Sequence, residues 1–281
     1  IFLRTSEFLW QEGHTAHATQ EEAEEEALKM LNIYKTFIEE YLAIPVKVGR
    51  KSESEKFPGA LHTYTVEAMM QDGKALQCGT SHNLGDNFAK AFNITYLDKN
   101  NQTQYVWQTS WGASTRLIGG MIMTHADENG IVLPPKMAEK QVVLIPIWKT
   151  EEEKNEVLKT TKEVESKIQG EGITTRLDER DYVTPGFKFN EWEKQGIPVR
   201  VEIGPKDIEK GSLIVVRRDT SEKTEIKIQD AEKNIKAMLD TIQSDMFTKA
   251  KNFIEENTRV VNTYEEFKEF IKTNKGFVKV Q

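Results

Sequence analysis

Two arginines in this sequence lie beside hydroxyl side chains, a combination that suits the binding of phosphate groups. Arg4 is followed by Thr5, and Arg116 follows Ser114 and Thr115. A guanidinium group offers a planar fork of donors to a phosphate, and neighbouring hydroxyls add hydrogen bonds. These residue types favour a site for a polyphosphate.

A second group of polar residues lies at 77–82, in the stretch QCGTSH. Side chains alternate between the two faces of a strand, so Thr80 and His82 share a face and Gln77 has the other parity. Gln77 can join them only if the strand bulges or ends there, which Gly79 permits. The stretch therefore predicts a polar site that depends on a local irregularity.

Other reactive residue types have simpler explanations. His14 and His17 are spaced as a zinc pair on a helix would be, but they precede the expected helix start and lack companion ligands, which disfavours a metal. Cys78 lacks a partner pattern for a nucleophile and is expected to be a small buried residue. Neither a P-loop nor a G-x-G-x-x-G pattern is present, which disfavours those nucleotide sites.

The composition indicates a globular protein of about two domains. The 281 residues are 38% hydrophobic and 30% charged, and no apolar run approaches the roughly 20 residues of a membrane span. With 38 Lys+Arg against 45 Asp+Glu, the net charge of −7 argues against indiscriminate nucleic-acid binding but allows a local basic patch. The chain opens on Ile1 without an initiator methionine or signal peptide, so we expect a segment of a longer, cytosolic protein.

The elements expected up to Pro134 are antiparallel strands with helices. An amphipathic helix begins after Thr19, which forms a capping box with Glu22, and ends before Pro45. A hairpin is predicted from residues 64–70 and 75–80, and another from 93–97 and 104–110. A helix is predicted over 117–124.

Beyond Pro135 the pattern changes to strands that alternate with helices. Residues 141–148 form a nearly continuous apolar run, typical of a strand buried on both faces. Further strands are predicted over 173–177, 197–203, 213–217 and 225–228, and helices over 151–169, 187–194 and 230–256. The alternation favours a three-layer α/β domain with a mostly parallel sheet. A short β-α-β tail follows Thr258.

Several stretches of the chain together resemble the prolyl-tRNA synthetases of the eukaryote/archaeal-like branch. Residues 2–16 (FLRTSEFLWQEGHTA) resemble the later half of their motif 2, and residues 110–119 (SWGASTRLIG) with 130–136 resemble motif 3. Residues 49–51, 55–57 and 77–85 resemble the prolyl-specific pocket. Residues 185–190 (PGFKFN), 192–193, 196–198, 204–207 and 216–220 resemble the anticodon-binding domain. The combination covers essentially the whole chain.

The resemblance implies an α+β class II catalytic domain with an antiparallel sheet, lacking its N-terminal part, and then an α/β anticodon-binding domain. The expected boundaries are 1–138 for the catalytic part, 139–245 for the anticodon domain and 246–281 for the start of a C-terminal domain. The implied activity is proline–tRNA ligase: ATP-dependent formation of prolyl-adenylate, then transfer to tRNA(Pro). A homodimer that uses ATP and Mg²⁺ is implied as well.

The resemblance also implies roles for residues that match motif positions. ATP would be bound by Arg4, Thr5, Gln77, Thr80, Ser114 and Arg116. Arg4 and Arg116 would be catalytic, and Gln77 would contact Mg²⁺ indirectly through ATP. Proline would be bound by Trp10, Glu12, His82, Trp111 and Gly112. Less specific positions for anticodon contacts are Arg180, Lys188 and Lys206.

Two alternatives stay open on the sequence alone. Motif 1 and the first arginine of motif 2 would lie upstream of Ile1, which favours a non-catalytic, truncated paralogue that binds tRNA or a partner. A regulatory domain that senses an amino acid is a weaker alternative, because it would not need the anticodon-domain stretch at 185–190. The retained set around Gln77 and Arg116 favours the enzyme.

Overall fold

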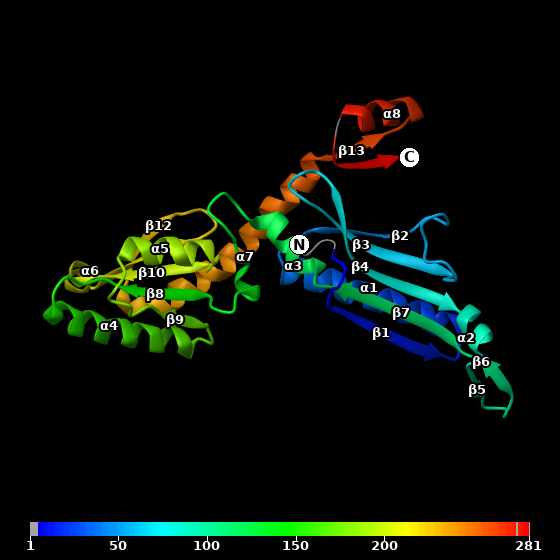
Figure 1. Cartoon of the computed structure of the whole chain (residues 1–281), viewed down its shortest axis with the longest axis horizontal. Helices are drawn as coiled ribbons and strands as arrows, with labels where there is room; N and C mark the ends of the chain where they lie inside the picture. Colours follow the sequence, from blue (N-terminus) through cyan, green and yellow to red (C-terminus); the bar gives the residue numbers. More distant parts are fainter. Residues whose placement is uncertain (1–4, 274, 281) are drawn as a thin grey trace. The chain divides into compact units, whose positions relative to one another are not determined.

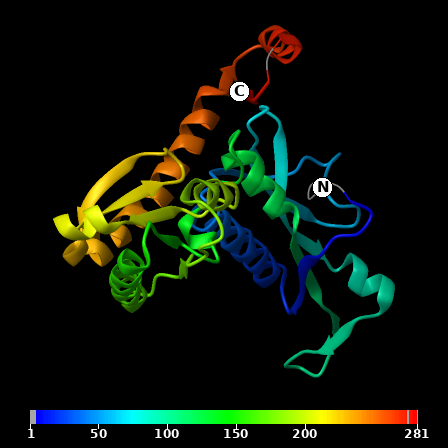
Figure 2. The ribbon, with the colours of Figure 1, turned by 60° about the vertical axis from the view of Figure 1, so that its left-hand side comes forward.

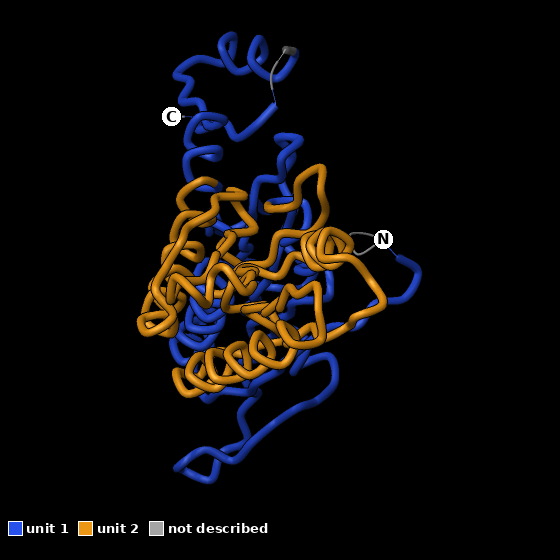
Figure 3. Tube along the Cα trace, turned by 90° about the vertical axis from the view of Figure 1, so that its left-hand side faces the viewer, with its two compact units in different colours: residues 1–40, 44–124, 250–281 blue, residues 41–43, 125–249 orange. Residues whose placement is uncertain are grey.

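The protein divides into two compact units, coloured separately in Figure 3. The computed structural model describes residues 5–273 and 275–280. Unit 1 comprises residues 1–40, 44–124 and 250–281, and unit 2 comprises residues 41–43 and 125–249. In the part of the chain that is described, no helix is both long and apolar enough to cross a bilayer.

Unit 1 is built on a five-stranded antiparallel sheet in the order β1-β7-β4-β3-β2 (Figure 1). The strands are β1 (Trp10–His17), β2 (Val46–Arg50), β3 (His62–Met69), β4 (Ala75–Gly85) and β7 (Trp107–Ser114). The predicted hairpin of β3 and β4 is confirmed, with its turn at Asp72-Gly73. β1 and β2, which the sequence pattern did not predict, are the two edges of the sheet.

Helix α1 (Gln20–Glu40) covers one face of this sheet. Its buried side chains recur at helical spacing, as predicted: Ala23, Ala27, Leu31, Tyr34 and Ile38. At its start the Thr19 hydroxyl accepts from the amide of Glu22, whose carboxylate accepts from the amide of Ala18. The Ser81 hydroxyl of β4 donates to the carbonyl of Ala27 over 2.7 Å and ties the helix to the sheet. The opposite face of β1, β7 and β4 is thereby left for a ligand.

Smaller elements complete unit 1. They are α2 (Asn87–Phe92), β5 (Thr95–Leu97), β6 (Thr103–Tyr105), α3 (Arg116–His125), β13 (Thr258–Val261), α8 (Tyr264–Thr273) and β14 (Phe277–Val280). β5 and β6 form a separate two-stranded ribbon. The second predicted hairpin is thus shorter than expected, because β6 ends at Tyr105 and the following strand, β7, pairs with β1 and β4 instead.

Unit 2 contains a five-stranded mixed sheet in the order β12-β11-β10-β8-β9. The strands are β8 (Val142–Pro146), β9 (Thr175–Leu177), β10 (Val199–Ile203), β11 (Ser212–Arg217) and β12 (Lys223–Lys227). β8 runs parallel to both β9 and β10, whereas β11 is antiparallel to both β10 and β12. The predicted parallel arrangement therefore holds at β8 and its neighbours, and the hairpin of β11 and β12 adds an antiparallel edge.

Helices cover both faces of this sheet, which gives the predicted three layers (Figure 2). They are α4 (Glu151–Gly170), α5 (Pro185–Lys194), α6 (Pro205–Lys210) and α7 (Ala231–Glu256), with 3₁₀ turns η1 (Pro135–Met137) and η2 (Ile228–Asp230). Val142 and Leu144 of β8 pack with α4 and α7, while Val143 and Ile145 pack beside α5. All five residues of β8 are buried, as its apolar run predicts.

Gly196 follows α5 and has a backbone that only glycine adopts without strain. Its φ is +76°, and a Cβ there would lie 2.6 Å from the carbonyl oxygen of Ile131. Gly196→Ala should therefore lower the free energy of unfolding by about 2 kcal/mol, measured by urea denaturation. Gly170→Ala is the matched control, because Gly170 ends α4 in open space and alanine there should be neutral or slightly stabilising. Equal effects at both positions would contradict this explanation.

Candidate functional site

A cavity of about 230 Å³ opens on the face of the unit 1 sheet that α1 does not cover. Nine of the residues singled out from the sequence line it: Trp10, Glu12, Gln77, Thr80, His82, Trp111, Gly112, Ser114 and Arg116. They come from β1, β4, β7 and the first residue of α3. Residues more than a hundred positions apart in the chain thus share one site.

The strand register explains this convergence. Glu12 of β1 pairs with Gly112 of β7, and Gly112 pairs with Thr80 of β4. Two residues away on each strand, His14 pairs with Ser110, and Ser110 pairs with His82. Residues directly opposite each other in adjacent strands point to the same face, so Glu12 and Thr80 of the first row and Ser110 and His82 of the second line the cavity with polar side chains.

The predicted irregularity beside Gln77 is present. Val66 of β3 pairs with Gly79 and the next residue, Glu67, pairs with Gln77, so Cys78 is the extra residue of a β-bulge. The bulge shifts the alternation of side chains along β4, so that Gln77 points to the same face as Thr80. There the Gln77 amide nitrogen donates to the Thr80 hydroxyl over 2.5 Å. Cys78 itself is buried, and this burial raises the pKa of its thiol to about 11, so it is a poor nucleophile.

Two cations meet at Gln77. The Lys51 ammonium donates to the side-chain oxygen of Gln77 over 2.8 Å, and Arg116 Nη1 donates to its main-chain carbonyl over 3.3 Å. The Ser114 hydroxyl accepts from the amide of Arg116 over 3.3 Å at the start of α3. Lys51 was not predicted as a site residue, although the stretch Gly49-Arg50-Lys51 had pointed to this region. Together these groups make one end of the cavity cationic and rich in donors.

The side of the cavity that β1 forms has an aromatic wall. The indole of Trp10 is 58% exposed and stands edge-to-face with Phe8, with 6.1 Å between ring centroids. It also lies beside Gly112, where a Cβ would come within 3.7 Å of the ring. Trp111 has the opposite strand parity, and its indole packs over Gly13 on the face of α1. Its side chain is therefore not placed as a wall of the cavity.

His82 lies two residues further along β4 than Thr80, opposite Ser110 of β7, and is neutral. Its burial, together with the positive charge of Lys51, lowers its pKa to about 4. The Phe57 ring lies beside it, with 5.1 Å between centroids. An uncharged imidazole in this position does not repel a cationic ligand.

Three of the residues considered from the sequence do not join the cavity. Thr5 is exposed, and its hydroxyl donates to the carbonyl of Glu7 over 2.6 Å. His14 and His17 lie on a strand and point to opposite faces, so they cannot share a metal ion. Among the described residues no cluster of three or more His, Cys, Asp or Glu side chains is arranged to bind a metal. Arg4 lies outside the described residues.

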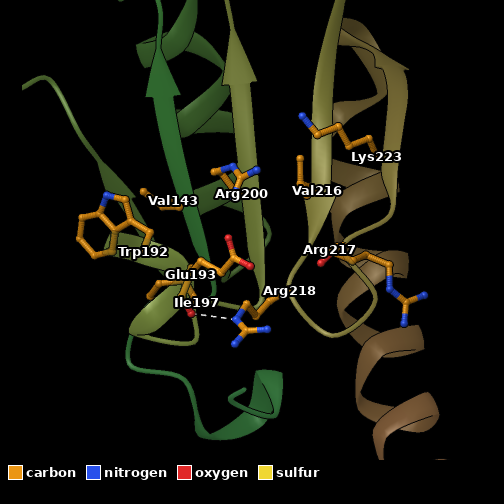
Figure 4. A pocket seen from close by; sticks show the side chains of 10 residues that line it. Val143, Trp192, Glu193, Ile197, Arg200, Val216, Arg217, Arg218 and Lys223 are labelled. Atoms are coloured by element: carbon orange, nitrogen blue, oxygen red, sulfur yellow. Dashed lines mark hydrogen bonds between the residues drawn. The ribbon is translucent and has the colours of Figure 1, made fainter. Parts of the chain in front are cut away.

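Unit 2 has a pocket of its own, of about 100 Å³, at the edge of α5 and strands β10 and β11 (Figure 4). Four basic residues line it: Arg200, Arg217, Arg218 and Lys223. Arg218 is 6% exposed; its Nε donates to the Glu193 carbonyl over 2.8 Å, and its two terminal nitrogens bind the Asp127 carboxylate at 2.6 and 2.7 Å. Glu193 and Trp192 of α5 complete the rim. The pocket combines an aromatic surface with basic side chains, each of which has a carboxylate partner: Glu202 for Arg200 and Lys223, Asp219 and Asp245 for Arg217, and Asp127 for Arg218.

The basic residues predicted to contact an anticodon lie elsewhere in unit 2. The Lys188 side chain is buried and donates to the carbonyl of Asp178 over 2.9 Å. Arg180 is paired with the carboxylates of Asp178 and Glu191. Only Lys206 is exposed, in the first turn of α6. The doublet Arg217-Arg218 within residues 216–220 was the signal in the sequence that could have identified the pocket.

Comparison with known proteins matches two separate regions of the chain. Residues 2–125 match the family model of the tRNA synthetase class II core domain (G, H, P, S and T), and residues 141–238 match that of the anticodon binding domain. The chain is 56% identical over 279 residues to a proline–tRNA ligase of Chlorobaculum tepidum, covering 99% of this chain and 57% of that protein. It is 52% identical over 278 residues to the proline–tRNA ligase of Porphyromonas gingivalis, covering 99% of this chain and 56% of that protein. The chain thus spans a little over half the length of these relatives.

Proposed function

This chain belongs to the prolyl-tRNA synthetase family of class II aminoacyl-tRNA synthetases, and we propose that it acts in the ATP-dependent attachment of L-proline to tRNA(Pro). The observation that carries the proposal is the convergence of a cationic end, a neutral histidine and an aromatic wall in one cavity of unit 1. In the first step a carboxylate oxygen of proline attacks the α-phosphorus of ATP, the bond to pyrophosphate breaks, and prolyl-adenylate forms. In the second step a hydroxyl of the terminal tRNA ribose attacks the prolyl carbonyl, and AMP leaves.

ATP is assigned to the cationic end of the cavity. Arg116 is aimed at the site by its bond to the Gln77 carbonyl, so its guanidinium can stabilise the negative charge that grows on the leaving pyrophosphate. Lys51 adds a second cation, and the Thr80 and Ser114 hydroxyls add polar contacts. We assign Arg4 and Thr5 to the phosphates as well, from their motif positions alone.

Mg²⁺ would enter this site with ATP and neutralise phosphate charge. The ion prefers oxygen ligands, usually one or two carboxylates together with substrate phosphates and water. Glu67 pairs directly with Gln77 across β3 and β4, so a carboxylate and an amide oxygen lie on the same face of the sheet. The Glu67 carboxylate is the group of this pair that fits the ion, because the Gln77 side-chain oxygen accepts from Lys51. We therefore assign Gln77 an indirect contact with the ion through ATP.

Proline is assigned to the β1 side of the cavity, where Trp10 and Glu12 lie. The Trp10 indole offers a flat surface to the pyrrolidine ring, and Gly112 leaves space beneath it. The Glu12 carboxylate, paired to Gly112 in the register, suits the protonated secondary amine of the amino acid. Trp111 would contribute its main chain, since its indole faces α1.

The pocket of unit 2 is assigned to the anticodon. The chain carries a net charge of −7, so tRNA binding must depend on local basic groups, and we assign this role to Arg200 and Arg218, whose present partners are the carboxylates of Glu202 and Asp127. The stacking surface of Trp192 and the donors of the arginines suit unpaired bases. We propose residues 1–138 as the catalytic part, 139–245 as the anticodon domain and 246–281 as the start of a further domain, in a cytoplasmic homodimer.

Arg200→Ala is expected to weaken binding of tRNA(Pro) about 5- to 100-fold, because it removes a charged donor from the pocket. Arg176→Ala is the matched control: it removes the same charge from an exposed position on β9 that does not line the pocket. Affinity would be measured by fluorescence anisotropy with labelled tRNA(Pro) at fixed salt concentration. Equal losses in both variants would show that only overall charge matters and that the pocket is not the binding site.

The proposed activity is tested by ATP–pyrophosphate exchange with each of the twenty amino acids in turn, with the intact mass of the polypeptide recorded. We expect the highest exchange with proline, since the cavity matches a ring with one cationic nitrogen. Exchange that is highest with another amino acid would overturn the assignment of proline. No exchange with any amino acid would favour the non-catalytic tRNA-binding alternative.

A further inference from the structure

Thr63 is a buried residue of β3 that lies beside His82 and does not itself line the cavity. It pairs directly with His82 across β3 and β4, and its side-chain oxygen is 3.0 Å from His82 Nδ1. The same oxygen accepts from the main-chain amide of Phe57 over 2.9 Å. Thr63 is 2% exposed, so water does not supply it with partners. Two groups, the Phe57 amide and the His82 imidazole, therefore share the Thr63 hydroxyl.

The other hydrogen bond of the Thr63 oxygen determines whether Thr63 or His82 is the donor in their contact. The Phe57 amide can only donate, so it occupies one acceptor position of the Thr63 oxygen. If His82 Nδ1 also donated to that oxygen, the Thr63 hydroxyl proton would be buried without an acceptor. The population of that arrangement would be about 5- to 150-fold lower than that of an arrangement in which the proton has an acceptor. If the Thr63 hydroxyl donates to Nδ1, every group is satisfied.

A neutral imidazole carries one proton, so an unprotonated Nδ1 leaves that proton on Nε2. His82 lines the cavity, and no residue in the described part of the chain is bonded to its Nε2. The positive charge of Lys51 and the Phe57 ring are the groups that face the imidazole from the neighbouring loop, and neither accepts a hydrogen bond from it. The Nε2–H donor is thus left for a ligand.

We propose that Thr63 is a positioning residue that holds His82 as the neutral Nε2–H form, so that the cavity presents one fixed donor and no positive charge beside the amino acid. The consequence for substrate binding rests on the proposed function. A protonated proline has no acceptor on its nitrogen, and its acceptors are the carboxylate oxygens. A fixed donor therefore favours the carboxylate, and an uncharged ring does not oppose the cationic amine.

The form of His82 is tested directly by ¹⁵N NMR of the protein labelled at histidine, with the His82 signals assigned from the His82→Gln variant. We expect Nδ1 to resonate as an unprotonated, pyridine-type nitrogen and Nε2 as a protonated, pyrrole-type nitrogen. Thr63→Val should shift both signals toward averaged values, and Thr63→Ser, which keeps the hydroxyl, should restore them. A protonated Nδ1 in the unaltered protein would overturn the proposal, whether or not the valine variant folds.

The kinetic consequence is tested with the intact protein that carries this chain. Thr63→Val should raise the KM for proline about 2- to 10-fold, the scale of one neutral hydrogen bond, and leave the KM for ATP nearly unchanged. Thr63→Ser should behave as the unaltered protein does. An equal rise in both KM values would indicate a merely structural role and contradict the proposal. If the NMR result holds but proline does not bind at all, the assignment of His82 stands and the proposed function fails.

Discussion

Arg116→Ala is expected to lower proline-dependent ATP–pyrophosphate exchange by about 10²- to 10³-fold, the loss typical of removing one preorganised donor to a developing negative charge. The Arg116 side chain is aimed by its bond to the Gln77 carbonyl, at the end of the cavity where Lys51 and Thr80 also lie. The rate constant falls because pyrophosphate carries more charge in the transition state than it does in bound ATP. The measurement is exchange at saturating ATP and proline.

Arg116→Lys separates charge from geometry in this experiment. Lysine keeps the positive charge but loses the planar fork, so we expect an intermediate rate. A thermal unfolding curve of each variant shows whether the fold is intact. Within the described residues the Arg116 side chain donates to the Gln77 carbonyl, and the loss of this one contact should change the melting temperature little. Exchange at the unaltered rate in Arg116→Ala would remove this residue from the reaction.

Asp178→Ala is expected to lower the free energy of unfolding of unit 2 by about 3–5 kcal/mol, because it leaves a buried cation without its counter-charge. Asp178 is 3% exposed and accepts from Arg180 at 2.7 and 2.9 Å and from the Trp192 indole over 2.8 Å. The Lys188 ammonium, 3.8 Å from the same carboxylate, is also buried. The loss would be measured by urea denaturation.

Asp245→Ala provides a matched control. Its carboxylate is also 2.7 Å from an arginine nitrogen, that of Arg217, but the Asp245 side chain is 53% exposed and Arg217 keeps a second partner in Asp219. Exposed pairs of this kind contribute less than about 1 kcal/mol. Similar losses in the two variants would show that burial does not set the cost.

The same carboxylate predicts a pH dependence. Burial alone would raise the pKa of Asp178, but hydrogen bonds from Arg180 and Trp192 and the charge of Lys188 outweigh burial and lower it well below the ordinary value of about 3.9. A group with a lowered pKa in the folded state stabilises the fold fully above its unfolded pKa and loses that contribution as the pH falls toward the folded value. Unfolding of the unaltered protein should therefore become easier below about pH 4, and Asp178→Ala should show a shallower acid dependence.

Much of the fold could be predicted because its elements have strong local signals. α1 has apolar residues at helical spacing behind a capping box, and β8 is an unbroken apolar run. β1 was missed because its cavity face carries polar residues such as Glu12 and His14 where an ordinary strand would bury apolar ones. The six residues of α6 are too few to show a helical period.

The site was predictable in part for a similar reason. Gln77 and Thr80 are three residues apart and can share a face of the strand only if it contains a bulge. The structure has this bulge at Cys78. Lys51 and Thr63 could not be selected, because their importance depends on which strand lies beside β4. Arg218 stands out as part of a doublet within the matched stretch 216–220, but Arg200 could not be separated from the other basic residues before the order β11-β10-β8 placed it beside that doublet. Local patterns identify elements, whereas the pairing of strands assembles sites.

The central claim, that the cavity of unit 1 and the pocket of unit 2 serve one tRNA ligase, is tested most directly by charging. The intact protein that carries this chain would be given ATP, radiolabelled proline and either tRNA(Pro) or a transcript of it with an exchanged anticodon. We predict ATP-dependent attachment of proline to tRNA(Pro) and a large loss with the exchanged anticodon. Binding of tRNA(Pro) without any attachment of proline would contradict the account and leave a tRNA-binding protein in its place.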